Sequence, residues 1–181
     1  RVLDLNNVFV NAADPEAWIL WAEEMGLPSS CCSWTKGLLV AARELQPDRI
    51  LCVGRGDCSP NEILSEWFLE MGLEVMRFDY PDRGDQEGLD SEIDRLCEAF
   101  SVDRSSAEEE RERLLEVRQM AWEVDRRTWW EGSVSGRMNH EILVSCSDMG
   151  GNPEAFRKKL SEVIRESERR KCFPCLLYTS P

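Results

Sequence analysis

Hydrophobic and polar positions in the first half of the chain follow helical and strand periods in turn. Helices are predicted over residues 15–25, 34–45 and 60–71, and strands over residues 2–10, 49–54 and 73–79. The run from 49 to 54 is apolar enough to be a buried strand, and Gly72 closes the helix that follows it. Strand, helix and strand at this spacing predict a parallel α/β unit.

The second half of the chain has no strand pattern. Helices are predicted over residues 89–100, 107–131, 138–146 and 153–170, with a glycine- and serine-rich break at 132–136. The expected fold class is therefore α/β, a partial parallel sheet of flavodoxin-like or Rossmann-like type followed by a helical region. We expect an amino-terminal α/β region over residues 1–88 and a helical region over residues 89–171.

Charge and cysteine usage narrow the functional classes. The 181 residues include 35 acidic and 22 basic side chains, and a net charge of −13 argues against nucleic acid as a partner. No apolar run approaches the roughly 20 residues that span a bilayer, and no signal peptide opens the chain. We therefore expect a cytoplasmic protein with no membrane contact and with its eight cysteines reduced; metal binding or redox chemistry is the usual reason for keeping several reduced thiols.

The two ends of the chain suggest a fragment. The first residue is Arg1 rather than methionine, and the residues after it already have the pattern of the interior of an element. Residues 172–181 hold the pair Cys172 and Cys175, and their last part, residues 175–181, resembles a translated sequencing adapter. We expect this tail to be non-native and assign it no function.

Two cysteines lie where metal ligands would be expected. Cys32 and Cys58 each precede a serine at a predicted transition from loop to helix, and Ser59-Pro-Asn-Glu62 has the pattern of a capping box. A thiolate is favoured before the positive end of a helix, and thiolates bind metals. Cysteine is also a common small buried residue, and this packing interpretation suits Cys52 in its strand and Cys97 on its helix.

Other chemistry-bearing residues favour ordinary roles. His140 is the single histidine and is expected to pack or to lie on the surface. Gly54-x-Gly56 lacks the third glycine of a dinucleotide fingerprint. Five tryptophans recur at helical spacing and are expected in the core or at a domain interface: Trp18, Trp21, Trp122, Trp129 and Trp130.

Three segments in order carry a resemblance to a known family. They are residues 26–39 with Cys31 and Cys32, Asp57-Cys58 after a strand, and residues 72–81. Together they resemble the 2-hydroxyacyl-CoA dehydratase D-component family, which includes 2-hydroxyglutaryl-CoA dehydratase and benzoyl-CoA reductase subunits. The stretch at residues 134–136 and the helix from Asn152 extend the resemblance over most of residues 1–171, as the amino-terminal part of a family subunit.

The resemblance implies a cofactor, a reaction and partners. A family subunit holds a 4Fe-4S cluster through three cysteines; the first two match Cys32 and Cys58, with Cys31 as the alternative register, and the third lies in a later α/β domain beyond this chain. Cys146, in a third Cys-Ser pair, matches a helical region without a ligand. An ATP-dependent activator protein gives one electron to a heterodimer with a second dehydratase subunit. A 2-hydroxyacyl-CoA thioester then loses water through a ketyl radical, which makes the enzyme a hydro-lyase, inactive as this fragment.

Three alternatives remain open. Within the family, the chain could derive from a benzoyl-CoA reductase-like or double-cubane-cluster reductase subunit. A non-catalytic α/β binding or scaffold domain, with cysteines that only pack, belongs to another functional class. A structural zinc site is a third interpretation, although the spacing lacks paired ligands.

Overall fold

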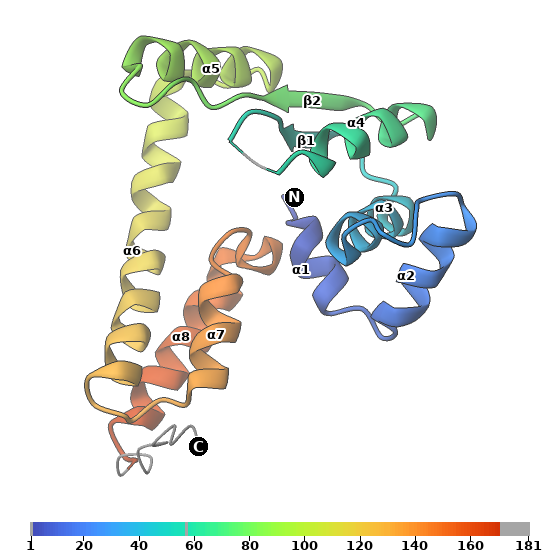
Figure 1. Cartoon of the computed structure of the whole chain (residues 1–181). Helices are drawn as coiled ribbons and strands as arrows, with labels where there is room; N and C mark the ends of the chain where they lie inside the picture. Colours follow the sequence, from blue (N-terminus) through green and yellow to red (C-terminus); the bar gives the residue numbers. More distant parts are fainter. Residues whose placement is uncertain (1, 57, 171–181) are drawn as a thin grey trace. The chain divides into compact units, whose positions relative to one another are not determined.

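The computed structural model describes residues 2–56 and 58–170, and Figure 1 shows the order of their elements. The strands are β1 (Ile50–Val53) and β2 (Val75–Phe78), and η1 (Met149–Gly151) is a short 3-10 helix. The α-helices are α1 (Leu5–Val10), α2 (Pro15–Glu24), α3 (Ser33–Leu45), α4 (Pro60–Glu70), α5 (Gln86–Ala99), α6 (Arg104–Trp129), α7 (Gly136–Val144) and α8 (Pro153–Ser167). The chain is thus mostly helical, with a small parallel sheet.

The described residues form two compact units. One, here called the sheet unit, holds residues 5–107, and the other, the helical unit, holds residues 2–4 and 108–170. The division lies inside α6, later in the chain than the expected boundary at residue 88. Helix α5 belongs to the sheet unit, where Arg104 pairs with Asp90 at 2.8 Å and with Asp94 at 2.7 Å.

The sheet unit is built around the predicted strand, helix and strand. β1 and β2 pair in parallel, with Ile50 opposite Val75 and Val53 opposite Phe78, and α4 makes the connection between them. A parallel pair needs such a crossover, so the spacing of the hydrophobic runs correctly predicted this part of the fold.

Helix α3 supplies much of the core of the sheet unit. Its apolar side carries Leu39, Val40 and Ala42, which are buried together with Ile50 of β1 and Phe68 of α4. Trp18 and Trp21 of α2 pack partly buried against this core. The apolar positions of three helices and a strand therefore converge on one cluster, as their sequence periods require.

The predicted strand over residues 2–10 is wrong, because the structure has helix α1 there. Phe9 is buried against α3, where a Cβ added to Gly37 would overlap its ring, and the same ring meets Trp34 edge-on at 5.6 Å. The contact of Phe9 with α3, a helix formed by later residues, thus overrides the alternating hydrophobic pattern of residues 2–10.

The helical unit has its own core, formed by α6, α7 and α8. Ala121, Val124, Ile142 and Leu160 are fully buried in it. Capping side chains begin its helices: Ser135 accepts the Met138 N–H at 3.3 Å, and Asn152 accepts the Ala155 N–H at 3.1 Å. The cap at Asn152 confirms the predicted start of the last helix.

The start of α6 differs slightly from the predicted start at residue 107. The carboxylate of Asp103 accepts the Ser106 N–H at 2.9 Å and the Ser106 hydroxyl at 2.7 Å. Aspartate is as strong a cap as serine, so the helix begins earlier, at Arg104. Across the described ranges, no helix is both long enough and apolar enough to cross a membrane.

The core of the sheet unit yields a stability prediction. Leu64 is buried on α4, and Leu64→Ala should lower the free energy of unfolding by about 2–5 kcal/mol, because it leaves a cavity. Leu51→Ala is the matched control, since Leu51 is 46% exposed and its truncation should cost less than about 1 kcal/mol. Urea titration followed by circular dichroism measures both, and equal losses would contradict the assigned core.

A carboxylate on α6 yields a second prediction. Glu123 accepts hydrogen bonds from Arg126 at 2.8 Å and from Arg127 at 2.7 Å, and Arg127 also donates to Ser167 of α8 at 2.9 Å. The two guanidinium groups lower the pKa of Glu123 from 4.5 to about 2. The ionised Glu123 carboxylate therefore stabilises the fold fully above pH 4.5, and this stabilisation is lost as the pH falls toward 2.

Glu123→Gln should reduce the free energy of unfolding by about 1 kcal/mol at pH 7, an amount limited by solvent screening. The difference from the wild type should narrow between pH 5 and pH 2.5, where the Glu123 carboxylate of the unfolded wild type gains a proton while that of the folded protein, with a pKa of about 2, stays largely ionised. Urea midpoints of both proteins across this range test it, and a gap that does not change with pH would show that Glu123 acts through packing alone.

Candidate functional site

Cys32 lies at the start of α3. Its backbone is extended, with φ −56° and ψ 137°, and its side chain is exposed. Its carbonyl accepts the N–H of Lys36 at 3.3 Å, the first helical bond. Cys31 is half-buried, and its N–H donates to the carbonyl of Pro28 at 2.9 Å, which closes a turn. The predicted position of Cys32 at a transition from loop to helix is therefore correct.

A buried lysine supports this turn. The Nζ of Lys36 lies 2.6 Å from Glu23 of α2 and 2.9 Å from the carbonyl oxygen of Ser29. Sequence reasoning missed this residue. A signal was present, because Lys36 shares a helical face with Leu39 and Val40, both of which are buried.

Cys58 lies just before α4 and is exposed. The capping box predicted beside it is wrong: Ser59 has helical backbone angles and its side chain makes no capping bond. Asn61 instead donates from its side chain to the carbonyl of Val53 at 3.3 Å, and Glu62 lies 3.5 Å from Arg77 of β2. The start of α4 is thus held by the ends of the two strands.

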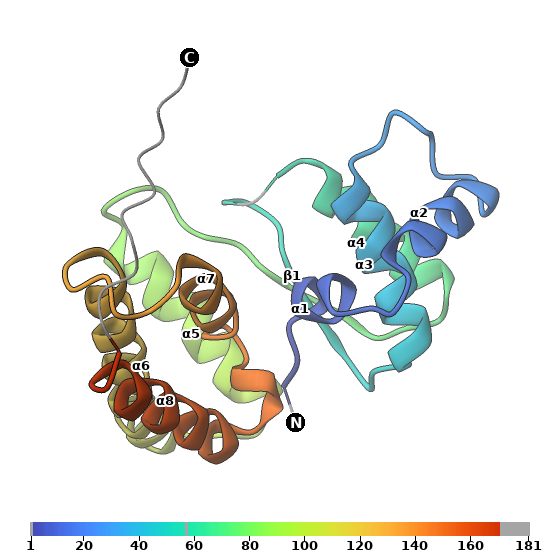
Figure 2. The ribbon, with the colours of Figure 1, turned by 90° about the horizontal axis from the view of Figure 1, so that it is seen from below.

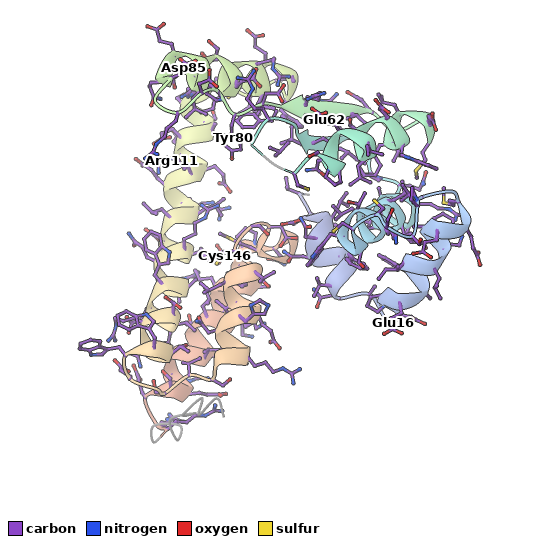
Figure 3. All side chains as sticks on the ribbon, in the orientation of Figure 1. Glu16, Glu62, Tyr80, Asp85, Arg111 and Cys146 are labelled. Atoms are coloured by element: carbon purple, nitrogen blue, oxygen red, sulfur yellow. The ribbon has the colours of Figure 1, made fainter. Side chains whose placement is uncertain are left out.

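The loop after β1 is fixed by the segment after β2. Arg55 donates its N–H to the Asp79 carboxylate at 2.7 Å and accepts the N–H of Tyr80 at 3.0 Å. Gly56 has φ +103°, and a Cβ there would come within 2.7 Å of the Tyr80 ring, so the position requires glycine. Tyr80 and Glu62 are labelled at this part of the sheet in Figure 3.

Ion pairs and hydrogen bonds keep the carboxylates of Asp79 and Glu92, beside the end of β2, ionised. The Arg55 N–H and the nearby Arg77 guanidinium lower the pKa of Asp79. Arg95, 2.6 Å away, lowers the pKa of Glu92, which also accepts the N–H of Asp79 at 3.3 Å. Neither carboxylate is therefore suited to carry a proton near neutral pH.

Connectivity relates the two candidate cysteines. A short connection at residues 46–49 joins α3 to β1, and another at residues 54–59 joins β1 to α4. Such connections turn the chain back, so both helices begin toward the carboxyl end of β1, and they pack together (Figure 2). Ligand sites of parallel sheets lie at this end. In the described ranges, however, no three His, Cys, Asp or Glu side chains gather as a metal-binding group.

The remaining cysteines lie in packed surroundings. Cys52 is buried in β1, and burial raises the pKa of its thiol to about 11, in line with the predicted packing role. Cys97 on α5 is half-buried. Cys146, labelled in Figure 3, is half-buried beside the core of the helical unit, and its Sγ contacts the Ile142 carbonyl at 3.4 Å. Cys172 and Cys175 are outside the described residues.

The other candidate residues from the sequence, a histidine and three tryptophans, are not part of the candidate metal site. His140 is exposed, as expected for a surface role. Trp122, Trp129 and Trp130 are 60%, 66% and 72% exposed, so they do not lie in a core, and the alternative of a domain interface stays a prediction. Trp129 and Trp130 shield each other only through an edge-on contact at 5.6 Å.

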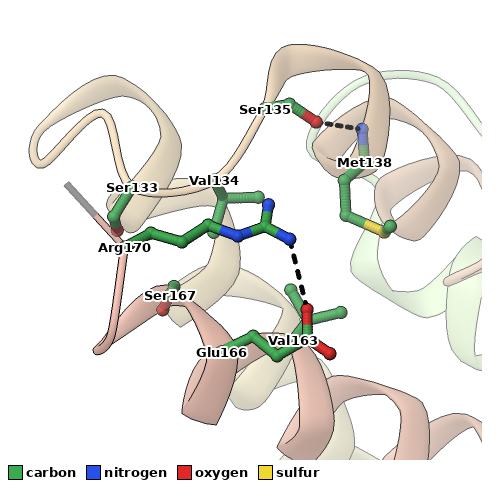
Figure 4. Close-up of a pocket in the computed structure, with 8 residues that line it drawn as sticks. All are labelled: Ser133, Val134, Ser135, Met138, Val163, Glu166, Ser167 and Arg170. Atoms are coloured by element: carbon green, nitrogen blue, oxygen red, sulfur yellow. Dashed lines mark hydrogen bonds and ion pairs between the residues drawn. The ribbon is translucent and has the colours of Figure 1, made fainter. Parts of the chain in front are cut away.

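A small cavity of about 50 Å³ lies in the helical unit, between residues 133–138 and the end of α8 (Figure 4). It has room for one or two water molecules. Arg170 at its rim pairs with Glu166 at 3.3 Å. The cavity contains none of the candidate cysteines and is too small for an organic substrate.

Comparison with known proteins adds no relative. No family model matches the chain, and neither the curated proteins nor the solved structures contain a match.

The exposure of the thiols predicts an order of alkylation. In the reduced protein at pH 8, iodoacetamide should modify Cys32 and Cys58 first and Cys52 at least about tenfold more slowly, because Cys52 is buried and its pKa is about 11. Mass spectrometry of peptides over time measures each site. The Cys52 rate should rise in urea, and equal rates in the folded protein would contradict the burial of β1.

Proposed function

We propose that the chain is the cluster-binding part of an iron-sulfur subunit of a 2-hydroxyacyl-CoA dehydratase-type enzyme. The observation that carries the proposal is the placement of Cys32 and Cys58, two exposed thiols that each precede a helix flanking β1. The three sequence segments that resemble the family include both residues. The small parallel sheet is, on this proposal, the first part of a flavodoxin-like or Rossmann-like sheet.

The donors suit a 4Fe-4S cluster in part. Iron-sulfur clusters are held by cysteine thiolates, and Cys32 and Cys58 would supply two of them. Backbone N–H groups at the starts of α3 and α4 favour negative charge there. The third thiolate would come from outside the described residues, since no three-ligand group exists within them.

The reaction assigns a limited task to this chain. When bound, the cluster would supply the one-electron reduction of a CoA-thioester carbonyl that allows the 2-hydroxyl to leave as water. The residues of the chain would hold two ligands, one at the start of α3 and one just before α4. A second subunit, and an ATP-dependent activator as the electron donor, complete the proposed enzyme. A benzoyl-CoA reductase-like or double-cubane-cluster reductase subunit would use the same ligands.

A second candidate is a non-catalytic α/β binding domain. The lack of a three-ligand group among residues 2–56 and 58–170 favours it. In that case Cys32 and Cys58 would be dispensable. The ion pairs and hydrogen bonds of Arg55, Arg77 and Asp79 would serve only to hold together the loops that follow β1 and β2.

The cluster proposal predicts the effect of removing each ligand. Protein produced anaerobically from the complete reading frame should contain iron and acid-labile sulfide, and should give an electron paramagnetic resonance signal after reduction. Cys32→Ser or Cys58→Ser should lower the iron content at least about fivefold, because each removes a thiolate ligand.

Cys97→Ser is the matched control, since Cys97 is half-buried on α5 and has no assigned ligand role. It should retain the iron content of the wild type. Cys31→Ser decides the register between the adjacent cysteines. Full iron in both the Cys32 and the Cys58 variants would reject the cluster proposal and leave the binding domain as the better account.

A further inference from the structure

The geometry points to Lys36 as the positioning residue of the turn that presents Cys31 and Cys32, an inference that rests on the proposed function for its purpose. Lys36 makes two bonds to this segment. Its backbone N–H donates to the Cys32 carbonyl at 3.3 Å, and its ammonium group donates to the Ser29 carbonyl at 2.9 Å. The backbone bond is the ordinary first bond of α3, so the ammonium bond to Ser29 is the contact with the turn that depends on the lysine side chain.

The burial of Lys36 gives this contact its strength. The residue is 2% exposed, and its charge is balanced by Glu23 at 2.6 Å. A buried ammonium must be paired and hydrogen-bonded, or its desolvation is costly. The ammonium therefore stays with its two acceptors, and it links the turn to α2 through Glu23.

An ordinary buried ion pair between α2 and α3 would need only Glu23. The additional bond to Ser29 is made to the connecting loop, where Pro28, Ser29 and Ser30 are exposed. Leu27 anchors the start of this loop in the core, with 3% exposure. Lys36 supplies a second anchor further along the loop, at Ser29.

Positioning matters because a metal ligand must be held to within roughly 0.5 Å. Exposed loops with few buried contacts open easily, and an open turn would present the Cys32 thiol over a range of positions. Lys36 thus acts on the candidate site through the backbone of the turn and without contact to a cofactor.

Three variants separate positioning from general stability. Lys36→Met keeps most of the buried stem and removes the ammonium group, and Glu23, 31% exposed, can then be solvated. Glu23→Gln keeps an acceptor for the lysine and leaves the Ser29 bond in place. Lys158→Met alters an exposed lysine on α8 and serves as the control for loss of a charge.

The readouts do not require a bound cofactor. In reduced apoprotein, Lys36→Met should increase amide exchange of the Cys31 N–H about tenfold and alkylation of the half-buried Cys31 thiol about fivefold. The Cys52 rate and the circular dichroism spectrum should stay at wild-type values. Glu23→Gln should lower thermal stability but leave the exchange of the turn within about twofold, and Lys158→Met should change neither.

The inference would be overturned if the Cys31 amide of Lys36→Met exchanged, and its Cys31 thiol reacted, at wild-type rates. Equal acceleration at Cys31 and Cys52 would also overturn it, since it would show general unfolding. In the protein from the complete reading frame, Lys36→Met should lower iron content at least about twofold, and full iron would remove the link to the cluster. A wild type without iron rejects the cluster proposal, while the exchange and alkylation results still decide the role of Lys36.

Discussion

The packing of α3 against α1, α2 and α4 is the constraint on which the sheet unit depends. Leu39 and Ala42 are fully buried in the shared core, and Phe9 lies so close to Gly37 that no larger residue fits there. Because protein interiors are densely packed, a helix seated in this way has little freedom to shift along its axis. The position of Cys32, at the first turn of α3, follows from core residues one to three turns further along.

Much of the fold could be predicted from periodicity, because local pattern and tertiary packing agree there. The strands at 50–53 and 75–78, with α4 between them, have the apolar runs and the closing glycine that such elements need. The prediction failed at α1, where burial of Phe9 against α3 decides the conformation. It also failed at Ser59, where Asn61 bonded to β1 holds the start of the helix. The first error arises from a contact between segments distant in sequence, and the second from a side-chain bond back to the end of β1, which local signals of a helix start do not contain.

Some features of the candidate site could be predicted from the sequence, and others could not. The positions of Cys32 and Cys58 before helices could be predicted, because proline, serine and apolar period mark a helix start locally. The role of Lys36 was harder to predict: its spacing from Leu39 and Val40 places it on the apolar face of α3, but a lysine in a first turn is normally solvated. Its burial depends on Glu23, which reaches it from another helix, and on the loop that returns from α2 to α3. The carboxylate network at Asp79 likewise exists only because two parallel strands end side by side.

The cysteines of the chain offer a comparison among themselves. Cys52 and Cys146 are covered by neighbours, and burial raises the pKa of both thiols, as expected where cysteine serves as a small apolar residue. Cys32 and Cys58 are exposed, so packing gives no reason for a sulfur-bearing side chain at either position. Helix starts favour anions, and a serine would satisfy the same backbone groups as well as a thiol does. On the proposed function, what cysteine adds over serine at these positions is a thiolate that can bind a metal.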